Sequence, residues 1–267
     1  MAITLEAPSN DVISLEEYVD YVDHHVDLDD IDSVCESAPM FRALMNNRSL
    51  IRDFVDGELR RWREYQSGNP YVGQTLIFVD RPEFTIRANM WAPPERVQRL
   101  SDAAFGTYAI AHDHNFSFMT GGYFGGGYAT SIYEYDGKAV EGRKDEQVEL
   151  RFLEDTTLPQ GKIMVYRCAQ DVHLQKAAEE FSVSLNLLIN AESRRRPQYF
   201  FDLERSRIRG SSYAEKGEAI ALCELAEHVG GDRTAELLAD LSAAAEDPFV
   251  KRSARNSFER LTTTTRR

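Results

Sequence analysis

Alternating apolar and polar residues dominate the middle of the chain, and this pattern predicts short β-strands. The best examples are residues 128–135, 147–153, 162–166 and 182–189, with a further strand around residues 198–203. Turn signals separate them, such as Asp136-Gly137, which is typical of a hairpin. Short strands at this spacing predict a mainly β fold, a barrel or a sandwich.

A glycine-rich segment, Gly121-Gly-Tyr-Phe-Gly-Gly-Gly127, lies between two of these strands and predicts a turn. No Gly-Lys-Ser/Thr follows it, so it is not a phosphate-binding loop. Tyr123 and Tyr128 stand among the glycines. They either belong to the core or line the mouth of a pocket, because glycine lets a ligand approach the backbone closely.

Helical patterns flank the barrel on both sides. We predict a helical N-terminal extension in residues 1–70, where Ser14-Leu-Glu-Glu17 forms a capping box, and a β-barrel in residues 71–208. Residues 209–267 are rich in alanine and leucine and predict an α-helical C-terminal extension. Its last helix, Pro248–Leu261, resembles the second helix of a HEAT repeat. These helices either pack on the barrel or mediate homodimerisation.

Three histidines are the strongest chemical signal. In a strand, His112 and His114 point to the same face and Asp113 points away. His173 follows later, after a turn at Leu158-Pro-Gln-Gly161. Imidazole is a good ligand for Fe, Zn, Cu and Ni, and three protein ligands leave positions open for substrate. The pattern predicts a mononuclear metal site.

The order of these motifs resembles the cupin superfamily of jelly-roll barrels over about residues 75–190. Cupins commonly add a Glu shortly after the His-x-His pair, but residues 115–119 contain no carboxylate. The remaining three-histidine pattern is similar to thiol dioxygenases of the cysteine dioxygenase type. That resemblance implies Fe(II) on His112, His114 and His173, although Mn, Ni, Cu or Zn remain open.

The same resemblance implies a role for Arg87, because an arginine on an earlier strand binds the substrate carboxylate in those enzymes. Met119 or a neighbour stands where some of them carry a crosslinked cysteine, so no thioether is expected. Glu134 is either a remote fourth ligand, a general base or a solvated carboxylate. Gln175 shares a face with His173 and either hydrogen-bonds a substrate or is an edge residue. Tyr128 is a third candidate catalytic residue.

Composition excludes several functional classes. The net charge of −13 argues against nucleic-acid binding, because polyanions are repelled. The three cysteines are scattered, so a disulfide framework is not expected and the predicted compartment is the cytoplasm. No apolar run is long enough for a membrane span.

The sequence therefore predicts a non-haem iron oxygenase or oxidase with a cupin-like barrel. Its expected partners are dioxygen and a small acidic or amino-acid-derived metabolite. A metal-dependent isomerase, epimerase or lyase is the alternative within the enzymes. A non-catalytic cupin-like binding protein is the alternative outside them.

Overall fold

The computed structural model describes residues 2–65, 69, 74–93, 109–190, 197–212, 217–245 and 248–264. The chain divides into two compact units. The first comprises residues 1–193 and 198–211, and the second comprises residues 194–197 and 212–267. The N-terminal helices and the strands thus belong to one unit, and the C-terminal helices form the other.

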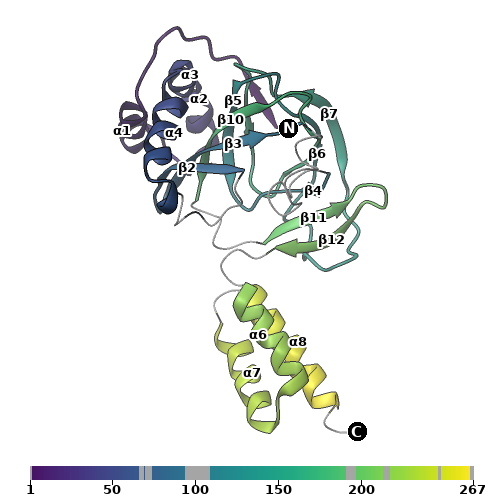
Figure 1. Ribbon diagram of the computed structural model, residues 1–267. Coiled ribbons are helices and arrows are strands. Elements are labelled where there is room, and N and C mark those ends of the chain that lie inside the picture. Colours follow the sequence, from purple (N-terminus) through teal and green to yellow (C-terminus); the bar gives the residue numbers. More distant parts are fainter. Residues whose placement is uncertain are drawn as a thin grey trace. The chain divides into compact units, whose positions relative to one another are not determined.

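Two six-stranded sheets build the first unit (Figure 1). The first sheet has the order β1-β8-β5-β10-β3-β2 and the second has the order β12-β11-β4-β9-β6-β7. The strands are β1 (Ile3–Leu5), β2 (Thr75–Asp80), β3 (Phe84–Trp91), β4 (Ala111–His112), β5 (Ser117–Phe124), β6 (Ala129–Glu134), β7 (Arg151–Thr157), β8 (Ile163–Tyr166), β9 (Asp171–Gln175), β10 (Ser182–Ile189), β11 (Gln198–Asp202) and β12 (Arg207–Ser212).

The chain passes back and forth between the sheets. Strands β8 and β10 lie in the first sheet, whereas β9 and β11 lie in the second. This alternation is characteristic of a jelly roll, and the pairs between the strands are antiparallel. The predicted mainly β, jelly-roll-like fold with helices before and after the barrel is confirmed. A residue facing inward from either sheet points into the space between them.

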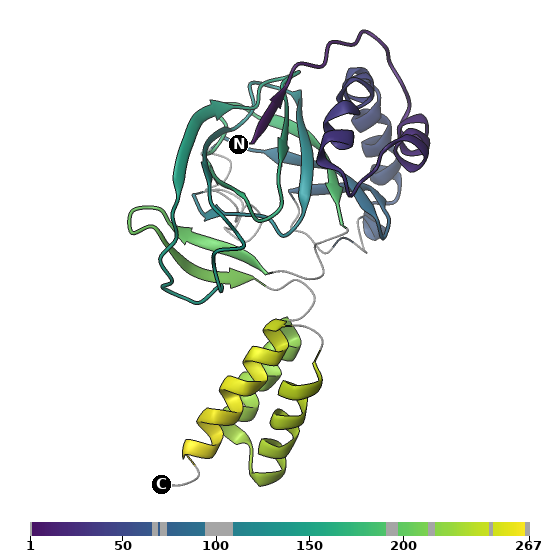
Figure 2. The same cartoon turned by 180° about the vertical axis from the view of Figure 1, so that it is seen from behind.

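Helices cover the outer face of the first sheet, as Figures 1 and 2 show from opposite sides. They are α1 (Leu15–His25), α2 (Ile31–Glu36), α3 (Ala38–Asn46) and α4 (Leu50–Arg60), followed by a 3-10 turn at Trp62–Glu64. The predicted capping box is present, because the Ser14 hydroxyl accepts from the Glu17 amide at 3.1 Å. Phe41 of α3 packs in one buried cluster with Ile86 and Leu185 of the sheet. This packing holds the first sheet in place, and the inner face of that sheet lines a cavity inside the barrel.

The predicted glycine turn is wrong in its first half. Strand β5 continues through Gly121 and Gly122 to Phe124. A side-chain carbon at Gly122 would lie 2.1 Å from the Pro159 carbonyl oxygen, and one at Gly121 would lie 2.4 Å from the Met45 sulfur. Gly121 therefore permits close packing of the sheet against α3 and Gly122 close packing against Pro159, and the change of direction comes only after them.

The strand predicted at residues 147–153 is shifted along the chain, since β7 spans Arg151–Thr157. β7 is an edge strand and pairs only with β6 among the described residues. Its Phe152 is 52% exposed, so an apolar residue there does not mark a core face. Val148 is nevertheless buried, against Tyr199 and Ile208.

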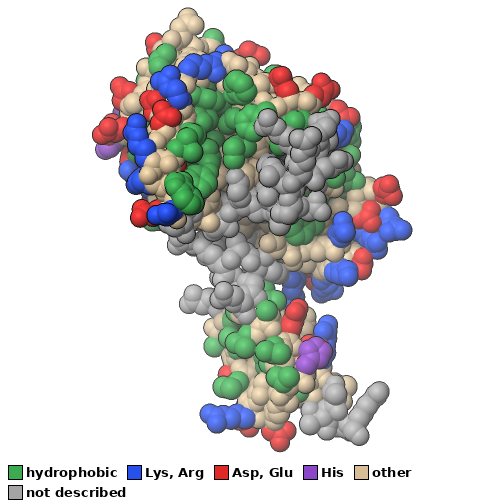
Figure 3. Space-filling model, in the orientation of Figure 1, with side chains coloured by type: hydrophobic (Ala, Val, Ile, Leu, Met, Phe, Trp, Pro, Cys, Tyr) green, Lys and Arg blue, Asp and Glu red, His purple; other side chains and the backbone are tan. Residues whose placement is uncertain are grey.

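The second unit contains α6 (Gly217–Val229), α7 (Asp232–Ala244) and α8 (Pro248–Thr264). Cys223, Leu238, Ala254 and Leu261 form its small core. Apolar side chains also gather on its surface (Figure 3), where Leu222, Leu225, Val229 and Leu237 are more than half exposed. Homodimerisation through these helices stays a prediction.

None of the described helices is long and apolar enough to cross a lipid bilayer. Cys35, Cys168 and Cys223 are not joined in disulfide bonds in the part of the chain that the structure describes.

Candidate metal centre

The three predicted histidines meet inside the barrel. One ligand atom from each of His112, His114 and His173 lies within 4.8 Å of the others, and all three side chains are buried. Among the described residues this is the one cluster of histidine, cysteine or carboxylate groups with the spacing of a metal site. The sequence pattern thus identified a cluster that the fold assembles.

The second sheet assembles this cluster by register. Strands β4 and β9 pair so that His112 lies directly opposite His173, and β6 places Ile132 on the other side of His173. Directly opposed side chains in an antiparallel pair lie on the same face and within contact distance. His114 follows the end of β4, and its ring centroid lies 5.0 Å from that of His112 and 4.9 Å from that of His173.

The Nε2 atoms fit a shared cation. His173 Nε2 lies 3.0 Å from His114 Nε2 and 3.1 Å from His112 Nε2. Two nitrogen ligands at right angles on an ion about 2.1 Å away lie about 3.0 Å apart, whereas a tetrahedral angle separates them by about 3.4 Å. The two spacings from His173 are therefore close to those expected for neighbouring ligands at right angles on one ion.

Protonation supports the same arrangement. The Nδ1 of His112 lies 2.8 Å from the Ile110 carbonyl oxygen and donates to it, so Nε2 of His112 carries a lone pair toward the cluster. Nδ1 of His114 and of His173 are buried without a partner among the described residues. The protein thus fixes one tautomer, and a cation bound to Nε2 would fix the other two.

Burial lowers the pKa of all three histidines. The pKa of His114 falls well below its usual value, first because of burial and then because of the nearby charges of His173, His112 and Arg87. The rings are therefore neutral at neutral pH and ready to bind a cation without first losing protons.

We expect the metal-free protein to lose stability as the pH falls below about 6.5, the usual pKa of histidine in an unfolded chain. The unfolded state then binds protons that the buried rings do not, so the free energy of unfolding decreases until the lower folded pKa values are reached. Each ring adds a slope of up to about 1.4 kcal/mol per pH unit in that window.

Urea unfolding between pH 7 and pH 5 measures this slope. A variant carrying His114→Gln and His173→Gln should show a clearly flatter dependence on pH. Equal slopes in the variant and the wild type would show that these two rings take up protons in the folded state.

Asp113 lies on the face opposite the histidines and is fully buried. Its Oδ2 accepts from the Tyr135 hydroxyl at 2.5 Å, and its Oδ1 accepts from the Tyr199 amide at 2.6 Å. The Asp113 amide in turn donates to the Tyr199 carbonyl oxygen. These bonds tie the His112–His114 segment to β11 and to the end of β6, and so fix the backbone that carries two of the ligands.

A cavity of about 340 Å³ opens onto the histidines. It contains three other residues predicted from the sequence, Arg87, Tyr128 and Gln175. Arg87 faces inward from β3, and its charge acts on His114. Burial raises the pKa of Tyr128 to about 12, against the effect of a hydrogen bond with Gln175. Tyr128 is therefore protonated at neutral pH and acts as a hydrogen-bond donor.

Aromatic rings surround the ligands. Phe116 and Phe118 each lie 4.8 Å from the His114 ring, centroid to centroid, and Tyr166 lies 5.0 Å from His173. Their packing restricts the imidazole rings and keeps water away from one side of the centre.

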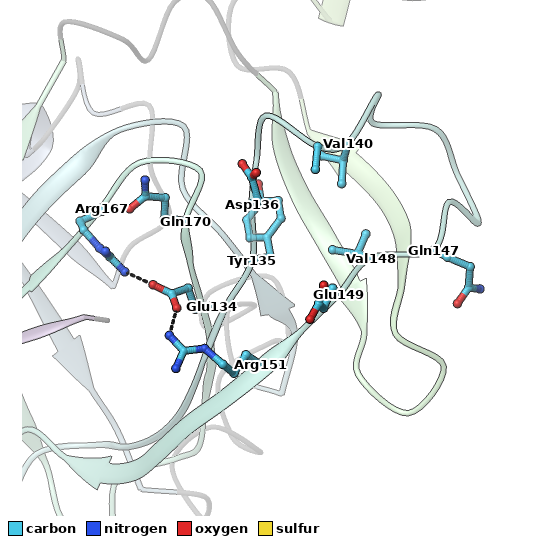
Figure 4. Close-up of a pocket in the computed structure, with 11 residues that line it drawn as sticks. Glu134, Tyr135, Asp136, Val140, Gln147, Val148, Glu149, Arg151, Arg167 and Gln170 are labelled. Atoms are coloured by element: carbon cyan, nitrogen blue, oxygen red, sulfur yellow. Dashed lines mark hydrogen bonds and ion pairs between the residues drawn. The ribbon is translucent and has the colours of Figure 1, made fainter.

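Two predicted residues lie elsewhere. Glu134 stands at the end of β6, where it pairs with Arg167 at 2.8 Å and with Arg151. Figure 4 shows it between these two arginines, in a separate pocket lined also by Gln170. Tyr123 faces the helices on the outer side of the first sheet, and its hydroxyl donates to the Asn47 carbonyl oxygen at 2.6 Å. Neither residue lines the histidine cavity.

The prediction from sequence missed the wall opposite the histidines, which includes Gln74, Asn89, Trp91 and Asn186, and it missed Gln198 of β11, on the histidines' own sheet. A signal for part of it was present. In residues 182–189 the polar positions Ser182, Ser184 and Asn186 alternate with apolar ones, which indicates one polar face of a buried strand.

No protein-family model matches the chain, and no curated protein matches it. Among solved structures, it is similar to a salicylate 1,2-dioxygenase from Pseudaminobacter salicylatoxidans, with 15% identity over 51% of this chain and 33% of that chain and a TM-score of 0.28. The chain thus spans a third of the length of that enzyme.

It is also similar to a hydroquinone 1,2-dioxygenase from Sphingomonas sp. TTNP3, with 11% identity over 45% of this chain and 68% of that chain and a TM-score of 0.31. A cupin-like protein from Thermotoga maritima is 10% identical over 48% of this chain and 74% of its own, with a TM-score of 0.25.

Proposed function

We propose that this protein is a mononuclear metal-dependent oxygenase or oxidase of the cupin type that acts on a small acidic metabolite. The observation that carries the proposal is the convergence of three neutral histidine nitrogens, 3.0 and 3.1 Å apart, inside a cavity that also contains Arg87. His112, His114 and His173 would hold the ion, with Fe(II) as the first candidate and Mn, Ni, Cu or Zn as the others.

Three neutral ligands leave the charge of a divalent ion uncompensated by protein. Such a centre favours anionic donors, such as an enolate, a thiolate or a carboxylate. When bound, Fe(II) would supply the redox chemistry with dioxygen that protein side chains lack. A three-histidine centre of this kind is similar to that of the cysteine dioxygenase type, which supports the oxygenase form of the proposal.

The protein side chains would bind and orient the substrate. Arg87 would hold its carboxylate. Tyr128 would donate a hydrogen bond from the hydroxyl that burial keeps protonated, and Gln175 would orient that hydroxyl. Phe116 and Phe118 would exclude water from the side of the centre that they cover.

Metal content and oxygen uptake test the proposal together. Protein purified without oxygen and without a histidine tag should contain close to one Fe per chain by elemental mass spectrometry. It should then consume oxygen with one member of a panel of small carboxylic acids. Turnover without oxygen uptake would favour an isomerase or lyase. Absence of any stoichiometric metal after reconstitution would overturn the proposal.

We expect Arg87→Gln to weaken binding of an acidic substrate by about 100-fold, because a charge-assisted pair with a carboxylate contributes about 2–3 kcal/mol. Metal content should stay at the wild-type level. The effect should appear mainly in KM. Arg151→Gln is the matched control, because Arg151 is an arginine outside the cavity that pairs with Glu134. Equal KM values in both variants would remove Arg87 from substrate binding.

A further inference from the structure

The wall that faces the histidines comes from the first sheet and is polar. Strands β3 and β10 pair so that Arg87 lies opposite Asn186 and Asn89 lies opposite Ser184. Directly opposed residues share a face, and Arg87, Asn89 and Asn186 all line the cavity. The metal ligands therefore stand on one sheet, and a separate group of polar side chains stands across from them on the other.

This lining has an unusual composition. Its carboxamides are Gln74, Asn89, Gln175, Asn186 and Gln198, and its permanent charge among the described residues is Arg87. No aspartate, glutamate or lysine is among the described residues that line it. A carboxamide both donates and accepts hydrogen bonds, as do the hydroxyl groups of a ligand, whereas a buried ammonium group needs a carboxylate to compensate its charge. The lining thus matches one anionic group and several neutral polar groups.

Local hydrogen bonds hold several of these side chains in place. The Thr120 hydroxyl donates to Asn186 Oδ1 at 2.6 Å, and Asn186 is only 3% exposed. The Thr75 hydroxyl donates to Asn89 Oδ1 at 3.1 Å, which directs the amide hydrogens of Asn89 away from Thr75. Preorganised polar groups lose little entropy when a ligand binds, so they contribute to selectivity.

We propose that the substrate is a small hydroxylated monocarboxylic acid without an amino group. Its carboxylate pairs with Arg87, its hydroxyl groups bond to the carboxamides of the wall, and its reacting end lies toward the histidines. The cavity of about 340 Å³ is at the small end of ligand sites, which suits an acid of about four to six carbons. This inference rests on the proposed function, and it replaces the expectation of an amino-acid-derived metabolite.

Calorimetry on the zinc-loaded chain tests it, because zinc is not redox-active and permits binding without oxygen chemistry. The probes are two matched pairs, threonate with butyrate and gluconate with hexanoate, together with 2-aminobutyrate. In at least one pair the hydroxylated acid should bind about 10-fold more tightly or better, as expected for two or more added hydrogen bonds. Hydroxylated acids that bind no more tightly than their parents or than 2-aminobutyrate, or no binding at all, would overturn the inference.

A substitution at Asn89 tests whether the polar wall causes the preference for hydroxylated acids. Asn89→Leu should reduce the preference for the hydroxylated acid by about 5-fold or more, while binding of the parent acid changes little. Gln170→Leu is the matched control, since Gln170 is an exposed carboxamide that lines the separate pocket of Figure 4. Circular dichroism confirms that both variants fold. An unchanged preference in folded Asn89→Leu would contradict the assigned wall.

The two proposals fail differently. One zinc per chain without any preference for hydroxylated acids would overturn this inference and leave the metal centre intact. Conversely, wild-type protein that binds neither zinc nor iron but still prefers hydroxylated acids would support the wall and overturn the proposed function.

Discussion

Replacing His173 with alanine should abolish stoichiometric metal binding. His173 is the middle ligand, because its Nε2 lies 3.0 Å from that of His114 and 3.1 Å from that of His112. Its loss leaves two neutral ligands in a cavity whose other described residues include no carboxylate to take its place. Removing a hydrogen-bond partner of a ligand already costs about 10- to 100-fold in affinity, so loss of the ligand itself should cost more.

Elemental mass spectrometry and a competition titration with a chromophoric chelator measure this effect. His24→Ala is the matched control, since His24 is an exposed histidine on α1 that bonds to Asp20 and lies beside His25. The control should bind one ion per chain with unchanged affinity. Full metal content in His173→Ala would remove His173 from the centre and with it the three-histidine assignment.

Replacing Asp113 with alanine should reduce the free energy of unfolding by about 3 kcal/mol. The change leaves the Tyr135 hydroxyl and the Tyr199 amide without the carboxylate that accepts from both, in a fully buried site. Because Asp113 lies between His112 and His114, the affinity for metal should also fall by about 10- to 100-fold. Urea unfolding of the metal-free protein gives the first quantity, and chelator competition at a temperature where the variant is folded gives the second.

Asp155→Ala provides the comparison, because Asp155 is an exposed carboxylate on β7 that bonds to Ser131. It should change stability by less than about 0.5 kcal/mol. Tyr135→Phe should lie between the two, at about 1 kcal/mol, since it removes one bond and keeps the charge. Wild-type metal affinity in folded Asp113→Ala would show that Asp113 stabilises the barrel without positioning the ligands.

The local sequence predicted the elements better than their ends. Alternation indicated β6, β8 and β10, and the capping box at Ser14 located the start of α1. The glycine turn was placed too early because glycine has two uses, positive φ in turns and close packing in strands. Gly122 serves the second, against Pro159, and Gly127, with a φ of 81°, serves the first. Only the approach of a distant segment distinguishes them.

What the sequence determined by itself was the chemistry of the centre. The spacing of His112 and His114 puts both rings on one side of the chain in any extended conformation. His173 is the one other histidine in the sequence of the predicted barrel, residues 71–208.

The tertiary structure decided which side chains share that space. Alternation shows which residues of one strand point the same way, but it does not show which way is inward or which residue lies opposite. Cross-strand register set His112 against His173 and Arg87 against Asn186. The helices packed on the first sheet bury Tyr123 on the side of the sheet away from the cavity. Arg151 and Arg167 form ion pairs with Glu134 outside the cavity. These outcomes depend on contacts between residues far apart in the chain, which no local pattern records.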